Sequence, residues 1–207
     1  MRRREFMTLL GGAVAWPLAA RAQQGMPMIG FLSSRSPGES ESLVSAFRQG
    51  LRDTGFIEGQ NVSIAFRWAE GRYDRLPALA AEVVELRVAL VFSAGGAPPA
   101  LAAKTATSTI PVVFSAVSDP VDVGLVTSLN RPGGNVTGMG VFNAALGPKR
   151  IELLKELVPS ANVLAYLLNP SHPSQQNEAN GAMTVARALG ISIPQSLLLR
   201  ADRVIGP

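Results

Sequence analysis

The stretch VALVFSAGGAPPALAAKTATSTIPVVFSAVSDP, residues 88–120, contains the four-residue word VFSA twice, at residues 91–94 and 113–116. Each copy ends a short, β-branched apolar run, and such runs are typical of buried parallel strands. The Ala-rich segment between the copies, residues 97–107, has two prolines near its start, which favours a helix. The stretch therefore predicts a strand–helix–strand unit. Its two strands end at the same edge of a parallel sheet, where open α/β sheets bind ligands.

Strands and helices alternate on both sides of this unit. Before it, the patterns predict two strands and two helices, at residues 27–32, 62–68, 39–54 and 75–86. After it they predict a short helix, a crossover strand that leaves the first sheet, and then a helix, a strand and a helix, at residues 121–128, 135–141, 148–157, 161–168 and 177–189. The fold class is therefore expected to be α/β: a doubly wound parallel sheet in residues 23–134 and an incomplete second α/β lobe in residues 135–207.

The N-terminus has the features of an export signal. Arg2, Arg3 and Arg4 precede an apolar run at residues 7–20, and Ala20-Arg21-Ala22 matches a small-residue cleavage site;. The run is shorter than the roughly 20 residues that a membrane-spanning helix needs. We therefore expect a signal peptide at residues 1–22, cleavage near Ala22 and a periplasmic protein. The pattern at residues 3–7 also fits the twin-arginine route, although the Sec route stays open.

The net charge and the residues available for catalysis argue against several classes of function. The chain has 19 basic and 15 acidic residues, but four of the basic residues and one acidic residue lie in residues 1–22. The remainder is nearly neutral, so charge gives no case for nucleic-acid binding. There is no cysteine, and the one histidine, His172, lies in a polar loop. Phosphate-loop, zinc-protease and nucleophile-elbow motifs are absent. We therefore expect no catalytic residue, metal or cofactor, and a protein that is not an enzyme.

Hydrogen-bonding groups follow the predicted strands at their carboxyl ends. They include Ser33, Ser34, Ser93, Gly95, Ser115, Asp119 and Asn169. Hydroxyls, backbone N–H groups and one carboxylate gathered at one sheet edge suit the binding of a small polar solute without its transformation. Asp119 has a second interpretation of equal weight, because it would also cap a helix that begins at Val121.

Several stretches resemble the periplasmic substrate-binding proteins of one ABC-transporter family. They include AFRQGLRDTGFIEGQNVSIAFRWAEGRYDRLPAL, VVFSAVSDPVDVGLVTSLNRPGGNVTGMG and KRIELLKELVPSANVLAYLLNP. The resemblance implies a two-lobed type I periplasmic binding fold that closes on a small solute, an amino acid in some members. It implies a permease of the inner membrane as partner. The ligand-facing positions that it implies are Ser33, Ser34, Ser93, Ala94, Gly95, Ser115, Asp119, Thr137 and Asn169.

The chain departs from that family pattern near its end. The segment ALGISIPQSLLLRADRV, residues 188–204, resembles the family's C-terminal tail but follows the helix at 177–189 directly. We therefore expect most of the second lobe to be missing and solute binding to be impaired. An incomplete lobe exposes a sheet edge, so a dimer or a segment swap through it is a further expectation. The alternatives from other classes are an exported α/β enzyme and a non-functional gene remnant.

Overall fold

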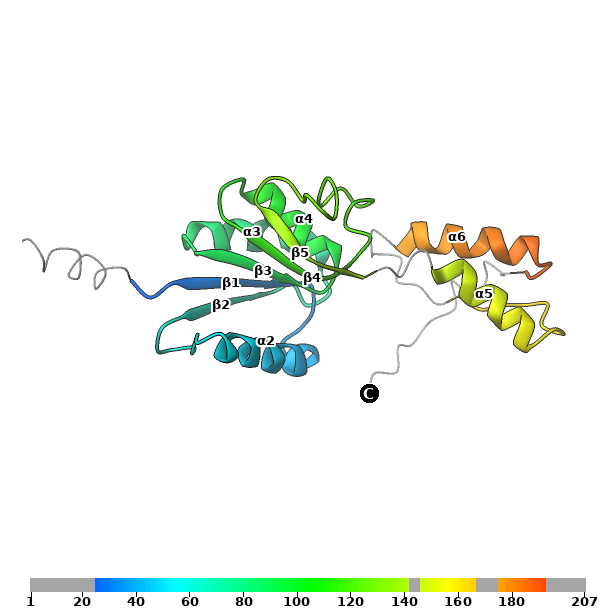
Figure 1. Ribbon diagram of the computed structural model, residues 1–207, viewed down its shortest axis with the longest axis horizontal. Coiled ribbons are helices and arrows are strands. Elements are labelled where there is room, and N and C mark those ends of the chain that lie inside the picture. Colours follow the sequence, from blue (N-terminus) through cyan, green and yellow to red (C-terminus); the bar gives the residue numbers. More distant parts are fainter. Residues whose placement is uncertain (1–24, 142–145, 167–174, 193–207) are drawn as a thin grey trace, which may run out of the picture.

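The computed structural model describes residues 25–141, 146–166 and 175–192. The predicted signal peptide, Asn169 and His172 lie outside these residues. A five-stranded parallel sheet has helices on both faces, and a pair of helices lies beyond the end of the sheet (Figure 1). This architecture confirms the α/β fold class that the sequence predicts.

The sheet has the order β2-β1-β3-β4-β5, with every neighbouring pair parallel. Its strands are β1 (Met28–Ser33), β2 (Ser63–Trp68), β3 (Leu90–Ala94), β4 (Val112–Ser118) and β5 (Val136–Val141). The helices between them are α2 (Glu41–Asp53), α3 (Leu76–Glu85) and α4 (Ala97–Ala106), with short 3₁₀ turns η1 (Gly38–Ser40) and η2 (Tyr73–Arg75). The predicted strand–helix–strand unit is thus β3-α4-β4, and two prolines lie in the first turn of α4;.

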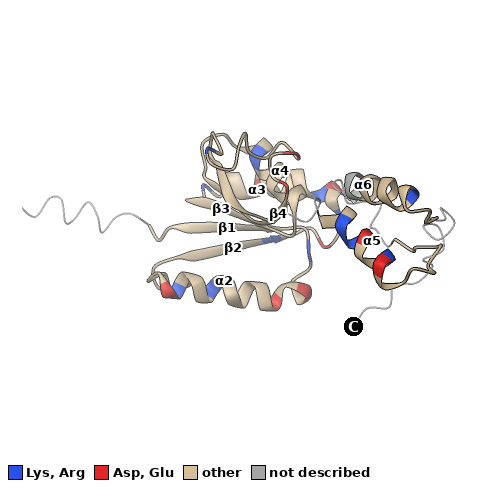
Figure 2. Cartoon of the chain, turned by 45° about the vertical axis from the view of Figure 1, so that its right-hand side comes forward, with Lys and Arg blue, Asp and Glu red and all other residues tan. Residues whose placement is uncertain are grey.

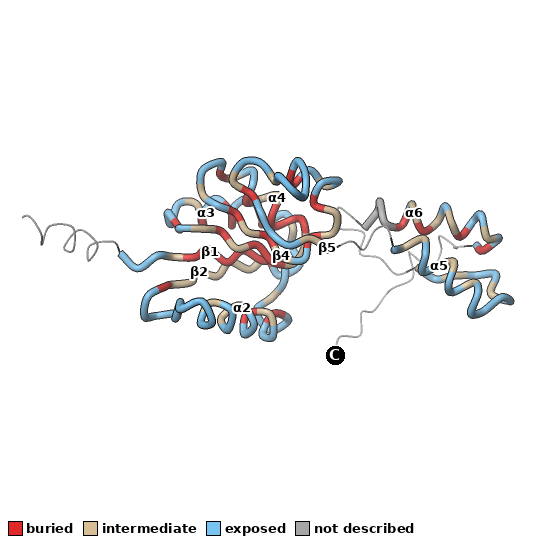
Figure 3. The backbone as a smooth tube through the Cα atoms, viewed as in Figure 1, coloured by how far each residue is buried: buried red, intermediate tan, exposed pale blue. Residues whose placement is uncertain are grey.

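Helices α3 and α4 cover one face of the sheet, and α2 covers part of the other (Figure 1). The main core lies under α3 and α4, where the buried side chains include Leu32, Val83 and Val91. Gly30 allows this close approach, because a Cβ at that position would overlap the side chain of Val83. Burial follows the strands and the inward sides of the helices (Figure 3).

An aromatic cluster fills the space between α2 and the sheet. Phe31 is fully buried at its centre, because the strand register places Phe66 of β2 on one side of it and Phe92 of β3 on the other. Phe47 of α2 closes the cluster at 5.4 Å from the Phe31 ring, measured between centroids. This cluster explains the amphipathic pattern of α2.

The two VFSA words lie side by side but one residue out of step. Val91 pairs with Val112, so that Ser93 lies opposite Phe114 rather than opposite Ser115. Because side chains alternate between the two faces of a sheet, Phe92 packs with the aromatic cluster, whereas Phe114 belongs to the core under α3 and α4;. The phenylalanines of the two VFSA words therefore pack in different cores, on opposite faces of the sheet.

After β4, one predicted element is absent and a second has a different place in the fold. Residues 121–124 form a turn and residues 125–128 have bends and no regular structure, instead of a helix, and Gly124 with φ of 71° interrupts the helical backbone;. The strand at 135–141 does form, but it pairs in parallel along β4 and is the fifth strand of the first sheet. The division into domains at residue 134 stays a prediction, although hydrogen bonding joins β5 to the first sheet.

The second part of the chain contains α5 (Leu146–Leu157) and α6 (Gln175–Ala188). They pack around a small core of Ile151, Ala182, Ala186 and Ile191. The strand predicted at 161–168 is reduced, as far as Tyr166, to one isolated parallel bridge between Val163 and Ser192. No helix among the described residues is long and apolar enough to cross a membrane.

Candidate ligand-binding site

The loops after β1, β2 and β3 are tied together at the carboxyl edge of the sheet. The Ala69 and Gly71 N–H groups donate to the carbonyls of Ser33 and Ser34, both at 2.8 Å. The Ser34 hydroxyl in turn donates to the Gly95 carbonyl at 2.7 Å. A Cβ at Gly95, which has φ of 90°, would overlap the Ser34 hydroxyl. Glycine at this position is therefore what allows the β1 and β3 loops to meet.

Most of the predicted serines at this edge are buried. Ser33 is fully buried, and its hydroxyl oxygen accepts the Arg35 N–H at 3.1 Å. Ser93 is also fully buried, and its register places it on the α3 and α4 face. Its hydroxyl has no hydrogen-bond partner among the described residues. The hydroxyls of Ser33 and Ser34 therefore hold loop backbone at this edge, whereas the buried hydroxyl of Ser93 makes no such contact.

Ser115 and Asp119 are the more accessible predicted groups, and both are half-buried. The Ser115 hydroxyl donates to the Ser93 carbonyl at 3.4 Å. After it, Ala116 is an extra residue in β4 with φ of 53°, and this bulge precedes Asp119, which has φ of 46°. Non-glycine residues with positive φ are uncommon and often mark functional loops. No helix begins at Val121, so the interpretation of Asp119 as a helix cap is wrong.

The remaining predicted ligand-binding positions, Ala94, Thr137 and Asn169, do not lie together. Ala94 is buried at the end of β3 on the α2 face, beside Ser33 in register. Thr137 is exposed at the second residue of β5 and pairs with Val113, about 13 Å along the strand from the carboxyl edge;. The structure thus brings together the positions of β1, β3 and β4 and leaves Thr137 apart from them. Asn169 lies outside the described residues.

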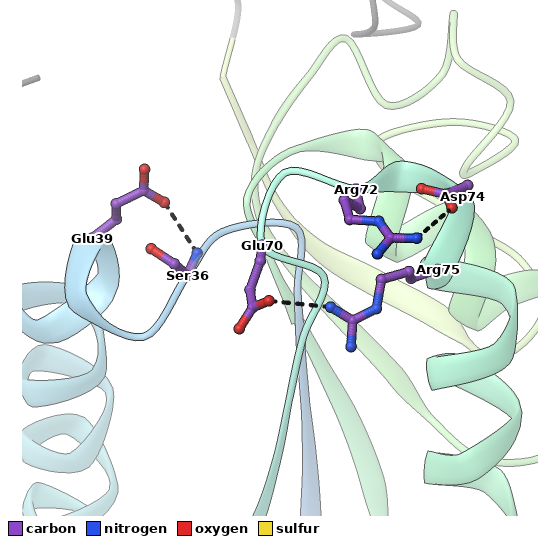
Figure 4. A network of polar contacts seen from close by, with 6 residues as sticks. All are labelled: Ser36, Glu39, Glu70, Arg72, Asp74 and Arg75. Carbon is purple, nitrogen blue, oxygen red and sulfur yellow. Dashed lines mark hydrogen bonds and ion pairs between the residues drawn. The ribbon is translucent and has the colours of Figure 1, made fainter. Parts of the chain in front are cut away.

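Charged residues that the sequence reasoning did not select lie in the loops at the same edge (Figure 4). Arg75 contacts Glu70, and Arg72 contacts Asp74, each at 3.2 Å. The Ser36 N–H donates to the Glu39 carboxylate at 3.0 Å, and this hydrogen bond lowers the pKa of Glu39. Exposed ion pairs such as Arg72–Asp74 and Arg75–Glu70 contribute little to stability, because water screens them. These charged residues follow strands in the sequence, and that position could have identified them. Charged residues occur in many other places along the chain, so the position alone does not single them out.

A groove of about 460 Å³ opens between α2 and β2, and not at the predicted site. Its lining includes Arg48, Arg52, Phe66 and Trp68. The predicted edge positions are absent from its lining, so the groove and the predicted site are different surfaces. Among the described residues, no group of three acidic or histidine side chains is placed to hold a metal ion.

A parallel sheet with helices on both faces and polar loops at its carboxyl edge is the architecture of one lobe of a periplasmic-type binding protein;. The chain belongs to the family described as ABC transporter substrate binding protein, whose sequence profile matches residues 36–204. Proteins of this family are substrate-binding proteins and typically work outside the cytoplasm.

Individual relatives support the same family. A tyrosine-binding protein of Clostridioides difficile (strain R20291) is 33% identical over 141 residues, which are 68% of this chain and 40% of that protein. The structure of an ABC domain from Streptococcus pneumonia in complex with L-Trp matches with a TM-score of 0.70 and 26% identity, over 81% of this chain and 56% of that one. A ligand-free, open substrate binding protein from Clostridium difficile with adhesive properties matches with a TM-score of 0.59 and 29% identity, over the same shares. The chain therefore spans about half the length of these relatives.

Proposed function

We propose that the chain is the solute-binding component of an ABC import system and that its solute is an amino acid. The observation that carries the proposal is the gathering of Ser34, Gly95, Ser115 and Asp119 at the carboxyl edge of one sheet, in a family with a tyrosine-binding relative and a relative bound to L-Trp. An aromatic amino acid is the first candidate among solutes.

The edge offers groups that suit both charged ends of an amino acid. The Asp119 carboxylate suits the ammonium group, because hydrogen bonds between ionised groups are the stronger ones. The N-terminus of α4, which follows Gly95 and Gly96, suits the carboxylate through the helix dipole, because a helix N-terminus attracts anions, but Pro98 and Pro99 in its first turn donate no N–H;. Ser33 then acts as a buried support of the loops.

Export and partner follow from the same proposal. Residues 1–22 carry the features of a cleaved signal, with cleavage near Ala22, so the site of action is the periplasm;. The partner is an ABC permease of the inner membrane. We expect weak binding, with a dissociation constant of about 1 mM, because the described edge forms only one wall around the solute.

Calorimetry on the purified chain tests the proposal, with L-Tyr, L-Trp and L-Leu as ligands. We expect at least one of the three to bind and Asp119→Asn to weaken that binding at least about tenfold, which is roughly 1.4 kcal/mol. Thr137→Ala is the matched control, because Thr137 is exposed and lies away from the edge. Absence of binding to all three amino acids would contradict the proposed solute class. An equal loss in both variants would contradict the proposed position.

A further inference from the structure

Helix α5 presents an apolar face that no other described element covers. Leu146, Leu153, Leu154 and Leu157 are exposed by 49%, 45%, 47% and 78%. Helix α6 packs against the side of α5 on which Ile151 is buried. The backbone trace of α5 is coloured as exposed over much of its length (Figure 3). A row of exposed leucines on one helix is typical of an interaction surface.

The spacing of the row is that of a helix-pairing seam. Leu146, Arg150, Leu153 and Leu157 follow one another at intervals of four, three and four residues. This is the repeat of 3.5 residues with which helices pack along one another. Arg150 is the one polar member, and the aliphatic part of its side chain can pack within an apolar seam.

We infer that two copies of this chain associate through α5, antiparallel and related by a two-fold axis. In such an arrangement Leu157 of one copy lies against Leu146 of the other, and Leu153 lies against the Arg150 stem. The same register places Lys149 of one copy beside Glu156 of the other, twice by symmetry. Opposite charges at these flanking positions favour one register over others.

The charges of α5 support this choice of occupant. Lys149 is exposed and contacts Glu152 of its own helix at 2.9 Å, so it is free to exchange that partner across an interface. Among the described residues Glu156 has no ion pair, and it lies on the same flank of the seam as Lys149. Charged residues of both signs lie along α5 (Figure 2). In this antiparallel register the surface therefore pairs apolar residues with one another and opposite charges with one another.

The exposed area of the leucine row limits how strong the dimer can be. The four leucines, at their exposed fractions, present roughly 400 Å² of surface per copy;. Two copies would bury at most about 800 Å², which is the size of a weak, transient interface. We therefore expect a dimer with a dissociation constant of about 1–100 μM that is concentration-dependent in solution.

Sedimentation velocity tests the inference on the full chain, expressed with its own leader and purified as the host processes it. We expect the mass to change from one chain to two across the micromolar range. The double variant Leu153→Glu/Leu157→Glu is expected to stay monomeric. Leu129→Glu is the matched control, because Leu129 is 51% exposed but lies in the loop before β5. Far-UV circular dichroism verifies that each variant retains its helices.

A charge exchange separates the proposed register from unspecific association. Lys149→Glu and Glu156→Lys are each expected to weaken the dimer several-fold, and the variant with both changes is expected to restore it. Three results would overturn the inference: a monomer at every concentration, a dimer that the α5 variants leave unchanged, or a series of larger aggregates. Failure of solute binding would leave this test unaffected, because α5 lies outside the proposed solute site.

Discussion

Replacement of Phe31 by alanine is the sharpest test of how the sheet and α2 are held together. Phe31 is fully buried in β1. Its ring lies within 5.1–5.4 Å of the rings of Phe47, Phe66, Trp68 and Phe92, measured between centroids. Rings at such distances attract one another beyond the effect of burial alone. The substitution therefore removes the centre of the cluster and leaves a cavity.

The expected loss of unfolding free energy for Phe31→Ala is about 3–5 kcal/mol, the usual range for a buried phenylalanine. A domain of this size has a total of about 5–15 kcal/mol, so the loss is a large fraction of its stability. With a urea slope of about 2 kcal/mol/M, the unfolding midpoint is expected to fall by roughly 2 M.

Urea unfolding followed by tryptophan fluorescence measures this change directly. Trp68 lies in the cluster, and the other tryptophan, Trp16, belongs to the predicted signal peptide. Phe56→Ala is the matched control, because Phe56 is 44% exposed and should lose no more than about 0.5 kcal/mol;. Equal midpoints for the two variants would refute the described aromatic core.

Four further substitutions have defined outcomes. Gly138→Ala is expected to lower the unfolding free energy by about 1–3 kcal/mol, because a Cβ at this position would overlap Phe114;. Gly147→Ala, which meets no atom within 4 Å, should leave stability unchanged or raise it;. Asn135→Ala removes two hydrogen bonds, of 3.1 and 2.7 Å, to carbonyls of the turn before β4, and is expected to cost about 1–3 kcal/mol in urea unfolding;. Burial raises the pKa of Tyr73, so its stabilising contribution is present below pH of about 10 and is lost as pH rises through the higher folded value;. A tyrosinate absorbance titration that loses its high-pH component in Tyr73→Phe would confirm this, and an unchanged titration would contradict it.

The regular elements that have a clear pattern of apolar residues in the sequence lie where the sequence predicts them. The apolar runs at β1, β3 and β4 and the amphipathic stripe of α2 identify these elements within a few residues. The helix predicted after β4 does not form. Its apolar residues suit a short helix, but Gly124 has a positive φ and the backbone hydrogen bonds there are those of turns. The prediction that β5 leaves the first sheet is also wrong, because no local sequence pattern indicates which strand lies next to it.

The sequence predicts where the candidate site residues lie in the sheet, but it does not predict which of them are exposed. The sequence places polar residues after β1, β3 and β4, and the parallel sheet brings these ends to one edge. It does not show that Ser33 and Ser93 are buried or that the Ser34 hydroxyl is used by Gly95. Thr137 was carried over from the family resemblance, and the pairing of β5 with β4 places it away from that edge.

The α/β alternation, the parallel sheet and the family of this protein follow from its amino-acid sequence. These depend on runs of neighbouring residues, whose periodicity and turn residues act over short distances. The one-residue offset between the two VFSA words, which places Phe92 and Phe114 on opposite faces of the sheet, is seen only in the folded chain. Strand register depends on packing between segments far apart in the chain, so the same four letters acquire different neighbours in each copy.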